Sequence, residues 1–238
     1  MAVPSAKPPR DLRFDSLRGL MLIMMTVNHL PSGLRFLTDK PCGIFSAAEG
    51  FVFLSGIMAG WVYTRRRHRE GSAGLWKATR GRANMIYRWH MGSFLGALVA
   101  VRVTDVLFGF CSQNSPLLFY QHPFLAIALG SVLLYQPGML DILPLYCAVV
   151  VALPWVLDQL ETGHRKRILT LSGAIWALVQ FAPPVDGGRF YPFVVGSFNV
   201  LAWQFIFFLG AVVGHAKADP DRDILPFRPL GLLAAAAV

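Results

Sequence analysis

An arginine and a histidine stand eleven positions apart in the first apolar segment, which reads RFDSLRGLMLIMMTVNHLP. At about 100° per residue, eleven residues turn a helix by roughly 1100°, or three turns plus about 20°, and they rise about 16 Å. Arg18 and His29 therefore share one helix face, about half a bilayer apart and too distant for a salt bridge. Because ionisable side chains within a membrane are costly and usually functional, the spacing predicts two positions along one pathway.

Each of these two residues has a chemical and a structural interpretation. A neutral imidazole is a suitable general base near pH 7, but His29 can equally anchor the outer end of a helix at the interface. The planar guanidinium of Arg18 can grip a phosphate group in a fork geometry. It can also extend to the inner interface as a topology anchor. The spacing alone leaves both pairs of alternatives open.

Four further charged residues are candidates for supporting roles. Asp15 lies three residues before the arginine, where it can orient the guanidinium or act as an ordinary acid of a first helical turn. Glu49 lies at the outer end of the second apolar segment, where a carboxylate can orient the imidazole or bind substrate. Arg102 and Asp105 have an i, i+3 spacing inside the third segment, so they can pair with each other or contact substrate.

The composition places these residues in a membrane protein. Of the 238 residues, 55% are hydrophobic and 15% are charged, which is more apolar than a typical soluble domain. Several apolar runs approach the length of a membrane span, and none has the alternation of a transmembrane β-strand. The runs cover about 15–35, 44–63, 91–110, 123–136, 139–157, 168–183 and 198–215, and another starts near 229. The sequence therefore predicts an all-α, polytopic transmembrane helical bundle.

Basic clusters set the predicted orientation, because cytoplasmic loops are rich in Lys and Arg. The clusters at 65–88 and 164–167 both lie inside, together with a cytoplasmic N-terminal tail at 1–13, if the short run 123–136 does not cross. We therefore predict six to seven spans within a transmembrane domain at 14–238, with 123–136 as a re-entrant or interfacial helix. The final GLLAAAAV stops within an apolar run, which predicts a C-terminally truncated chain.

Other features exclude function classes or leave alternatives. The net charge of +9 is explained by membrane topology, and no nucleic-acid motif accompanies it. The three cysteines lack metal-ligand spacing, so no metal is expected. Cys42 and Cys111 both lie in predicted outer loops. They can form a disulfide or remain two free thiols. The stretch 75–90 mixes apolar and basic residues. This pattern is compatible with an amphipathic helix at the inner interface and with a solvated loop.

The segments RFDSLRGL, MTVNHLP and AAEGFVFLSG resemble the acyltransferase family 3 membrane proteins, which carry Arg-x10-His in the first span and a Phe-rich LSG motif in the second. Together with LDILPLY at 140–146, they are similar to the OpgC branch, the osmoregulated periplasmic glucan succinyltransferases. The resemblance implies a bacterial inner-membrane enzyme that moves an acyl group, succinyl in this branch, from cytoplasmic acyl-CoA to a hydroxyl of a periplasmic glucan. It also implies that Arg18 and His29 are the essential pair.

This resemblance suggests roles for the charged residues. Arg18, assisted by Arg65, Arg66 and Arg67, is predicted to hold the phosphates of the acyl-CoA at the inner face. His29 is predicted to take the proton of the acceptor hydroxyl, either in a direct transfer or through an acyl-histidine. The alternative function is a transporter or flippase-like component of envelope polysaccharide assembly, and a third is a catalytically silent scaffold subunit. The sequence leaves open the acyl group, the acceptor glycan and the oligomeric state.

Overall fold

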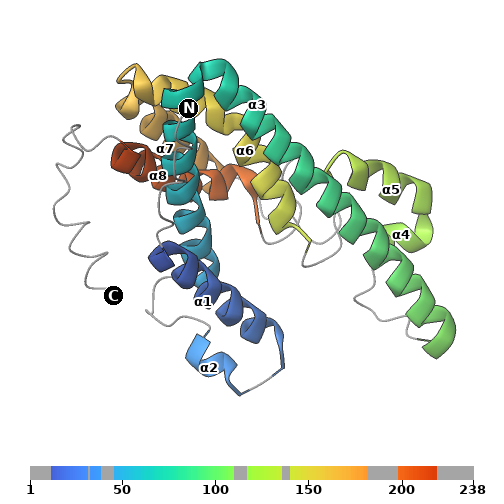
Figure 1. Cartoon of the computed structure of the whole chain (residues 1–238). Coiled ribbons are helices and arrows are strands. Elements are labelled where there is room, and N and C mark those ends of the chain that lie inside the picture. The colour runs from blue at the N-terminus through green and yellow to red at the C-terminus, as the bar shows by residue number, and fades with distance from the viewer. Residues whose placement is uncertain are drawn as a thin grey trace, which may run out of the picture.

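A computed structural model describes residues 12–31, 33–38, 46–109, 117–135, 140–181 and 198–218. Every regular element within these ranges is a helix, as predicted. Figure 1 shows them in chain order: α1 (Leu12–His29), α2 (Arg35–Thr38), α3 (Ala47–Phe108), α4 (Leu117–Gln121), α5 (Pro123–Ser131), α6 (Ile142–Glu161), α7 (Arg165–Gln180) and α8 (Val200–Ala218). Cys42 and Cys111, for which a disulfide and two free thiols are the alternatives, lie outside the described residues, as does the apolar run from 229.

Three of the described helices, α3, α6 and α8, are long and apolar enough to cross a membrane, which indicates a membrane protein. The prediction of six to seven spans is therefore not supported. Helix α1 has 18 residues but includes Arg13, Asp15 and Arg18, and α7 has only 16 residues. The short run at 123–136 forms α5, a helix of nine residues, which is too short to cross a bilayer. Its position relative to the membrane remains a prediction.

Helix α3 contains a sharp bend at Gly71. This residue has φ 71° and ψ 180°, a combination that is open to glycine and strained for other residues. Figure 1 shows the two arms of α3, residues 47–70 and 72–108, meeting at this bend. We expected a basic loop over 65–88, whereas the structure continues as helix on both sides of Gly71. The helical alternative for 75–90 is thus correct, and its placement at an interface stays a prediction.

The first arm of α3 packs backbone against backbone on α8. Gly56 and Gly60 on α3 face Gly210 and Gly214 on α8, and a Cβ atom added at any of the four would lie under 3.0 Å from backbone atoms of the other helix. Small residues four positions apart permit this close approach between helices. The glycines of the second apolar segment therefore serve helix packing.

Helix α1 lies against the first arm of α3 in the antiparallel direction. Near its start, the Phe14 ring lies 6.3 Å from the Trp61 ring, and further along Met21 contacts the position of Gly50. No residue of α1 is fully buried. At the end of α1, the side-chain amide of Asn28 donates to the backbone oxygen of Thr38 (3.0 Å), and the Thr38 hydroxyl donates back to the Asn28 side chain. These bonds hold α2 beside the end of α1.

Candidate functional site

Arg18 points into the helix bundle. Its guanidinium carbon lies 5.2 Å from the centre of the Phe51 ring on α3. Its Nε atom is buried and has no hydrogen-bond partner. The Phe51 ring also makes an edge contact with the Tyr146 ring of α6, with 6.0 Å between centroids. Arg18 therefore lies at a junction of α1, α3 and α6.

His29 is the last residue of α1 and is exposed. Because α1 is continuous from Leu12 to His29, the shared face expected from the spacing follows directly. His29 lies eight residues beyond Met21, or about 12 Å along the axis. Helix α3 begins at Ala47, only three residues before Gly50, which lies against Met21. The imidazole thus lies past the end of the first arm of α3.

Glu49 forms part of the N-terminal cap of α3. Its carboxylate accepts hydrogen bonds from the Ser46 backbone N–H (2.7 Å) and the Ser46 hydroxyl (3.2 Å). The Glu49 N–H donates in return to the Ser46 hydroxyl (3.3 Å). This is a capping box, which satisfies backbone donors that have no partner within the helix. The carboxylate proposed as a partner of the imidazole is therefore engaged in starting α3.

The other supporting candidates lie at separate places. Asp15 is in the first turn of α1, where a carboxylate interacts favourably with the helix dipole. Arg102 and Asp105 form the expected i, i+3 ion pair at 3.3 Å, and the Arg102 guanidinium lies 5.8 Å from the Tyr120 ring centre. Figure 1 shows this end of α3 beside α4 and well apart from α1. The structure does not bring this ion pair to the Arg18 junction.

The three arginines predicted to bind the acyl-CoA phosphates differ in their surroundings. Arg65 is exposed and lies 5.2 Å from the Trp61 ring centre. Arg66 pairs with Glu70 at 2.9 Å. Arg67 pairs with Asp158 of α6 at 2.7 Å. Two of the three are thus already neutralised by carboxylates of the chain.

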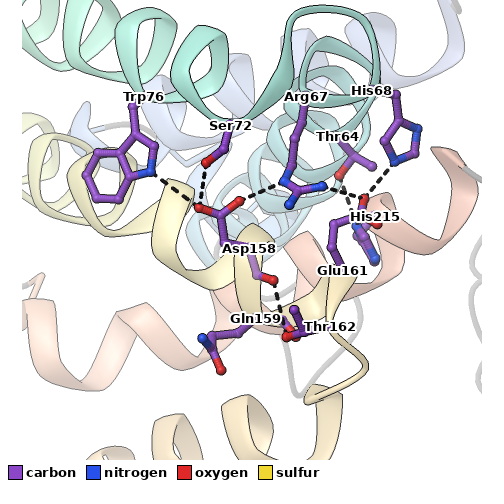
Figure 2. A network of polar contacts seen from close by, with 10 residues as sticks. All are labelled: Thr64, Arg67, His68, Ser72, Trp76, Asp158, Gln159, Glu161, Thr162 and His215. Atoms are coloured by element: carbon purple, nitrogen blue, oxygen red, sulfur yellow. Dashed lines mark hydrogen bonds and ion pairs between the residues drawn. The ribbon is translucent and has the colours of Figure 1, made fainter.

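Asp158 connects α6 to both arms of α3. Its carboxylate accepts hydrogen bonds from Arg67, before the bend, and from the Ser72 hydroxyl (2.9 Å) and the Trp76 indole N–H (3.3 Å), after the bend. Figure 2 shows these three donors converging on the one carboxylate. The three bonds therefore fix the angle that Gly71 permits.

Glu161, one turn further along α6, lies at the same end of the bundle. Its carboxylate oxygen is 2.7 Å from the Nε2 atom of His68 and 3.9 Å from the Nδ1 atom of His215. The Thr64 hydroxyl lies 3.0 Å from that His215 nitrogen. Figure 2 shows the polar network that joins α3, α6 and α8. Within the described ranges, no group of three or more His, Cys, Asp and Glu side chains is suited to a metal ion.

Sequence reasoning missed the network because its partners are about ninety positions apart. The available signal was the pair of acids in DQLE, residues 158–161, at the end of an apolar run and just before a basic cluster. The predicted topology places these acids at the inner end of their apolar run. The basic residues that follow the second apolar run lie at the same end, so ion pairs between the two groups could have been expected. Their individual partners depend on how α6 packs against α3.

Replacing Asp158 by asparagine is expected to destabilise the protein by about 1–3 kcal/mol, because three donors lose a charged acceptor. The side chains of Arg67 and Asp158 are only 25% and 28% exposed, so solvent screens the pair incompletely. The check is thermal unfolding of the purified protein in detergent. The matched control is Glu70→Gln, since the Arg66–Glu70 pair is 42% exposed on both sides and contributes about 0.5 kcal/mol or less. Equal melting temperatures for the two variants would contradict the role of Asp158.

Comparison with known proteins gives one family. A family model described as OpgC protein matches residues 10–238, which is essentially the whole chain. No curated protein and no solved structure matches.

Proposed function

Because the chain belongs to the OpgC family, we propose that it is a transmembrane O-acyltransferase. It moves an acyl group, succinyl in our proposal, from cytoplasmic acyl-CoA to a hydroxyl of a periplasmic glucan or another envelope carbohydrate. It works in the bacterial inner membrane with its N-terminus in the cytoplasm. The observation that carries the proposal is the family match over residues 10–238. The positions of Arg18 and His29 on the continuous helix α1 support it.

In this proposal His29 is the general base. The acceptor hydroxyl attacks the thioester carbonyl, and the imidazole takes the hydroxyl proton as the new carbon–oxygen bond forms. The carbon–sulfur bond then breaks, and the CoA thiolate leaves and takes up a proton. This direct transfer needs no covalent intermediate on the protein. The exposed position of His29 at the end of α1 suits an acceptor that approaches from outside the bundle.

In this proposal the phosphates of the acyl-CoA donor are held near Arg18, toward the N-terminal end of α1 and away from His29. Arg18 lies about 16 Å along the helix from His29, and an extended pantetheine arm covers a similar distance. Arg66 and Arg67 have carboxylate partners, so other cations make the first contact with the phosphates. The exposed residues Lys77 and Arg80 line a surface hollow beside the bend together with Trp76. They are suited to that contact.

The function is tested with membranes that contain the protein and with succinyl-CoA carrying a labelled acyl group. Transfer of label to a glucan, at a rate that depends on the amount of protein, supports the proposal. A transporter of envelope polysaccharide leaves the thioester intact, and so does a silent scaffold. An unchanged thioester in the presence of the glucan would therefore reject the enzyme.

Replacing Arg18 by lysine is expected to raise the KM for acyl-CoA by about tenfold. Lysine keeps the positive charge but loses the planar fork that binds two phosphate oxygens at once. A topology anchor would function equally well as lysine, so the KM separates the two interpretations of Arg18. The matched control is Arg69→Lys, at an exposed position of α3. The measurement is steady-state transfer at several donor concentrations, with the membrane level of each variant determined.

A further inference from the structure

Three buried polar atoms without hydrogen-bond partners come from three different helices. They are the Nε atom of Arg18 on α1, the hydroxyl of Ser55 on α3 and the hydroxyl of Tyr146 on α6. Ser55 is only 6% exposed. A buried polar atom left without a partner costs roughly 1–3 kcal/mol. Such atoms in a folded protein therefore call for an explanation.

The three groups converge around the Phe51 ring. Arg18 stacks over this ring, and Tyr146 meets it edge-on. Ser55 follows Phe51 by one helical turn and faces the same way. The Tyr146 hydroxyl lies close enough to Ser55 for a side-chain hydrogen-bond interaction and close enough to Arg18 for an electrostatic one. By strict distance and angle criteria, neither hydroxyl completes a hydrogen bond.

Two pairs of buried polar residues elsewhere in the described bundle are in contact with each other. The Ser172 hydroxyl donates to the Gln204 side-chain oxygen (2.6 Å), and the Gln204 amide donates to the Ser172 backbone oxygen (2.9 Å). Thr64 and His215 are likewise in contact at 3.0 Å. The groups around Phe51 contrast with these two pairs, and buried atoms of Trp61, His90 and Tyr135 also lack hydrogen-bond partners.

The chemistry of the three groups defines what they can bind. The Arg18 Nε–H is a charged donor, and each hydroxyl can donate one hydrogen bond. Three donors with one positive charge, in surroundings of low dielectric constant, match an oxyanion. Hydrogen bonds from an arginine to phosphate oxygens are among the stronger ones in proteins.

We propose that Arg18, Ser55 and Tyr146 form a phosphate-binding site at the junction of α1, α3 and α6. The assignment to the donor phosphates rests on the proposed function. Arg18 lies about 16 Å along α1 from His29, so the free carboxylate of a short succinyl group at the imidazole cannot reach this site. A phospholipid headgroup presents the same phosphate chemistry and is the other possible source.

The test uses the full chain with Tyr146→Phe and Ser55→Ala, which each remove one hydroxyl. The matched control is Tyr135→Phe, because the Tyr135 hydroxyl is buried too and its ring packs on Phe94 away from the junction. The probes are CoA, measured by equilibrium binding, and succinyl-pantetheine, a donor without phosphates, measured by transfer. Phospholipid that remains bound to the purified protein is quantified for each variant. Thermal unfolding confirms that each variant is folded.

Each hydroxyl variant is expected to weaken CoA binding by about 10- to 100-fold, the effect of one hydrogen bond to a charged group. Transfer from succinyl-pantetheine should remain unchanged, and so should all properties of the control. Loss of bound phospholipid with unchanged CoA binding supports the phosphate site and assigns it to lipid. If neither CoA nor phospholipid binding changes relative to the control, the site is rejected. If the unmodified chain binds no CoA and transfers no acyl group, the proposed function fails, and the phospholipid measurement still decides the site.

Discussion

His29→Ala is expected to lower acyl transfer by about 10²- to 10⁴-fold, the usual contribution of a general base. The imidazole ends α1 and is exposed, so its removal leaves no cavity in the bundle. The protein should therefore reach the membrane and unfold at the same temperature as the unmodified chain. The measurement is the initial rate of label transfer from succinyl-CoA, normalised to the amount of protein in the membrane.

Two further substitutions make this result specific. His164→Ala removes an exposed histidine whose ring contacts the neighbouring Thr162, and it should leave the transfer rate unchanged. His29→Gln keeps a polar side chain of similar size that cannot accept the proton, so it should be as inactive as the alanine variant. Full activity of either His29 variant would show that the residue only anchors the helix.

Gly214→Ala is expected to destabilise the protein by about 1–3 kcal/mol. Its new Cβ atom would lie under 3.0 Å from the backbone of Ile57 on α3, and backbone atoms cannot rotate away as a flexible side chain does. Helices α3 and α8 would have to separate along their whole line of contact. Since α3, α6 and α8 together form the main apolar core, the damage spreads beyond one residue. The check is thermal unfolding in detergent, where each kcal/mol corresponds to roughly 2–4 °C.

The matched control is Gly96→Ala on the second arm of α3. An added Cβ atom has no neighbour within 4 Å there, and alanine is favoured over glycine inside a helix by up to about 1 kcal/mol. This variant should therefore be as stable as the unmodified chain or slightly more so. Equal stability of the two alanine variants would show that α3 and α8 do not approach as closely as the glycines indicate.

The positions of the helices were largely predictable, because each apolar run of sufficient length became a helix. The short run at 123–136, which its length and the positions of the basic clusters set apart from the longer runs, contains the nine-residue helix α5. The continuation of α3 through residues 65–88 was not predicted. A dense set of charges indicates a loop in a membrane protein, yet arginine, lysine and alanine are good helix formers. Only the backbone angles of Gly71 show where the chain changes direction.

The candidate site was predictable only where its residues lie within one helix. The Arg18–His29 spacing lies within one helix, so its geometry follows from the helical repeat alone. The cap formed by Ser46 and Glu49 was not predicted, although the S-x-x-E pattern before an apolar run was the signal for it. By contrast, the convergence of Arg18, Ser55 and Tyr146 requires three helices to pack together. Positions so distant in the sequence give no local signal.

The direct backbone contact between α3 and α8 has a consequence for how molecules reach the interior. Where carbonyl oxygens of one helix touch glycines of the other, no acyl chain or nucleotide can pass. Helix α1 buries no residue and so forms the looser wall of this part of the bundle. A ligand on its way to the Arg18 junction is therefore admitted along α1, and widening that seam disturbs little of the apolar core.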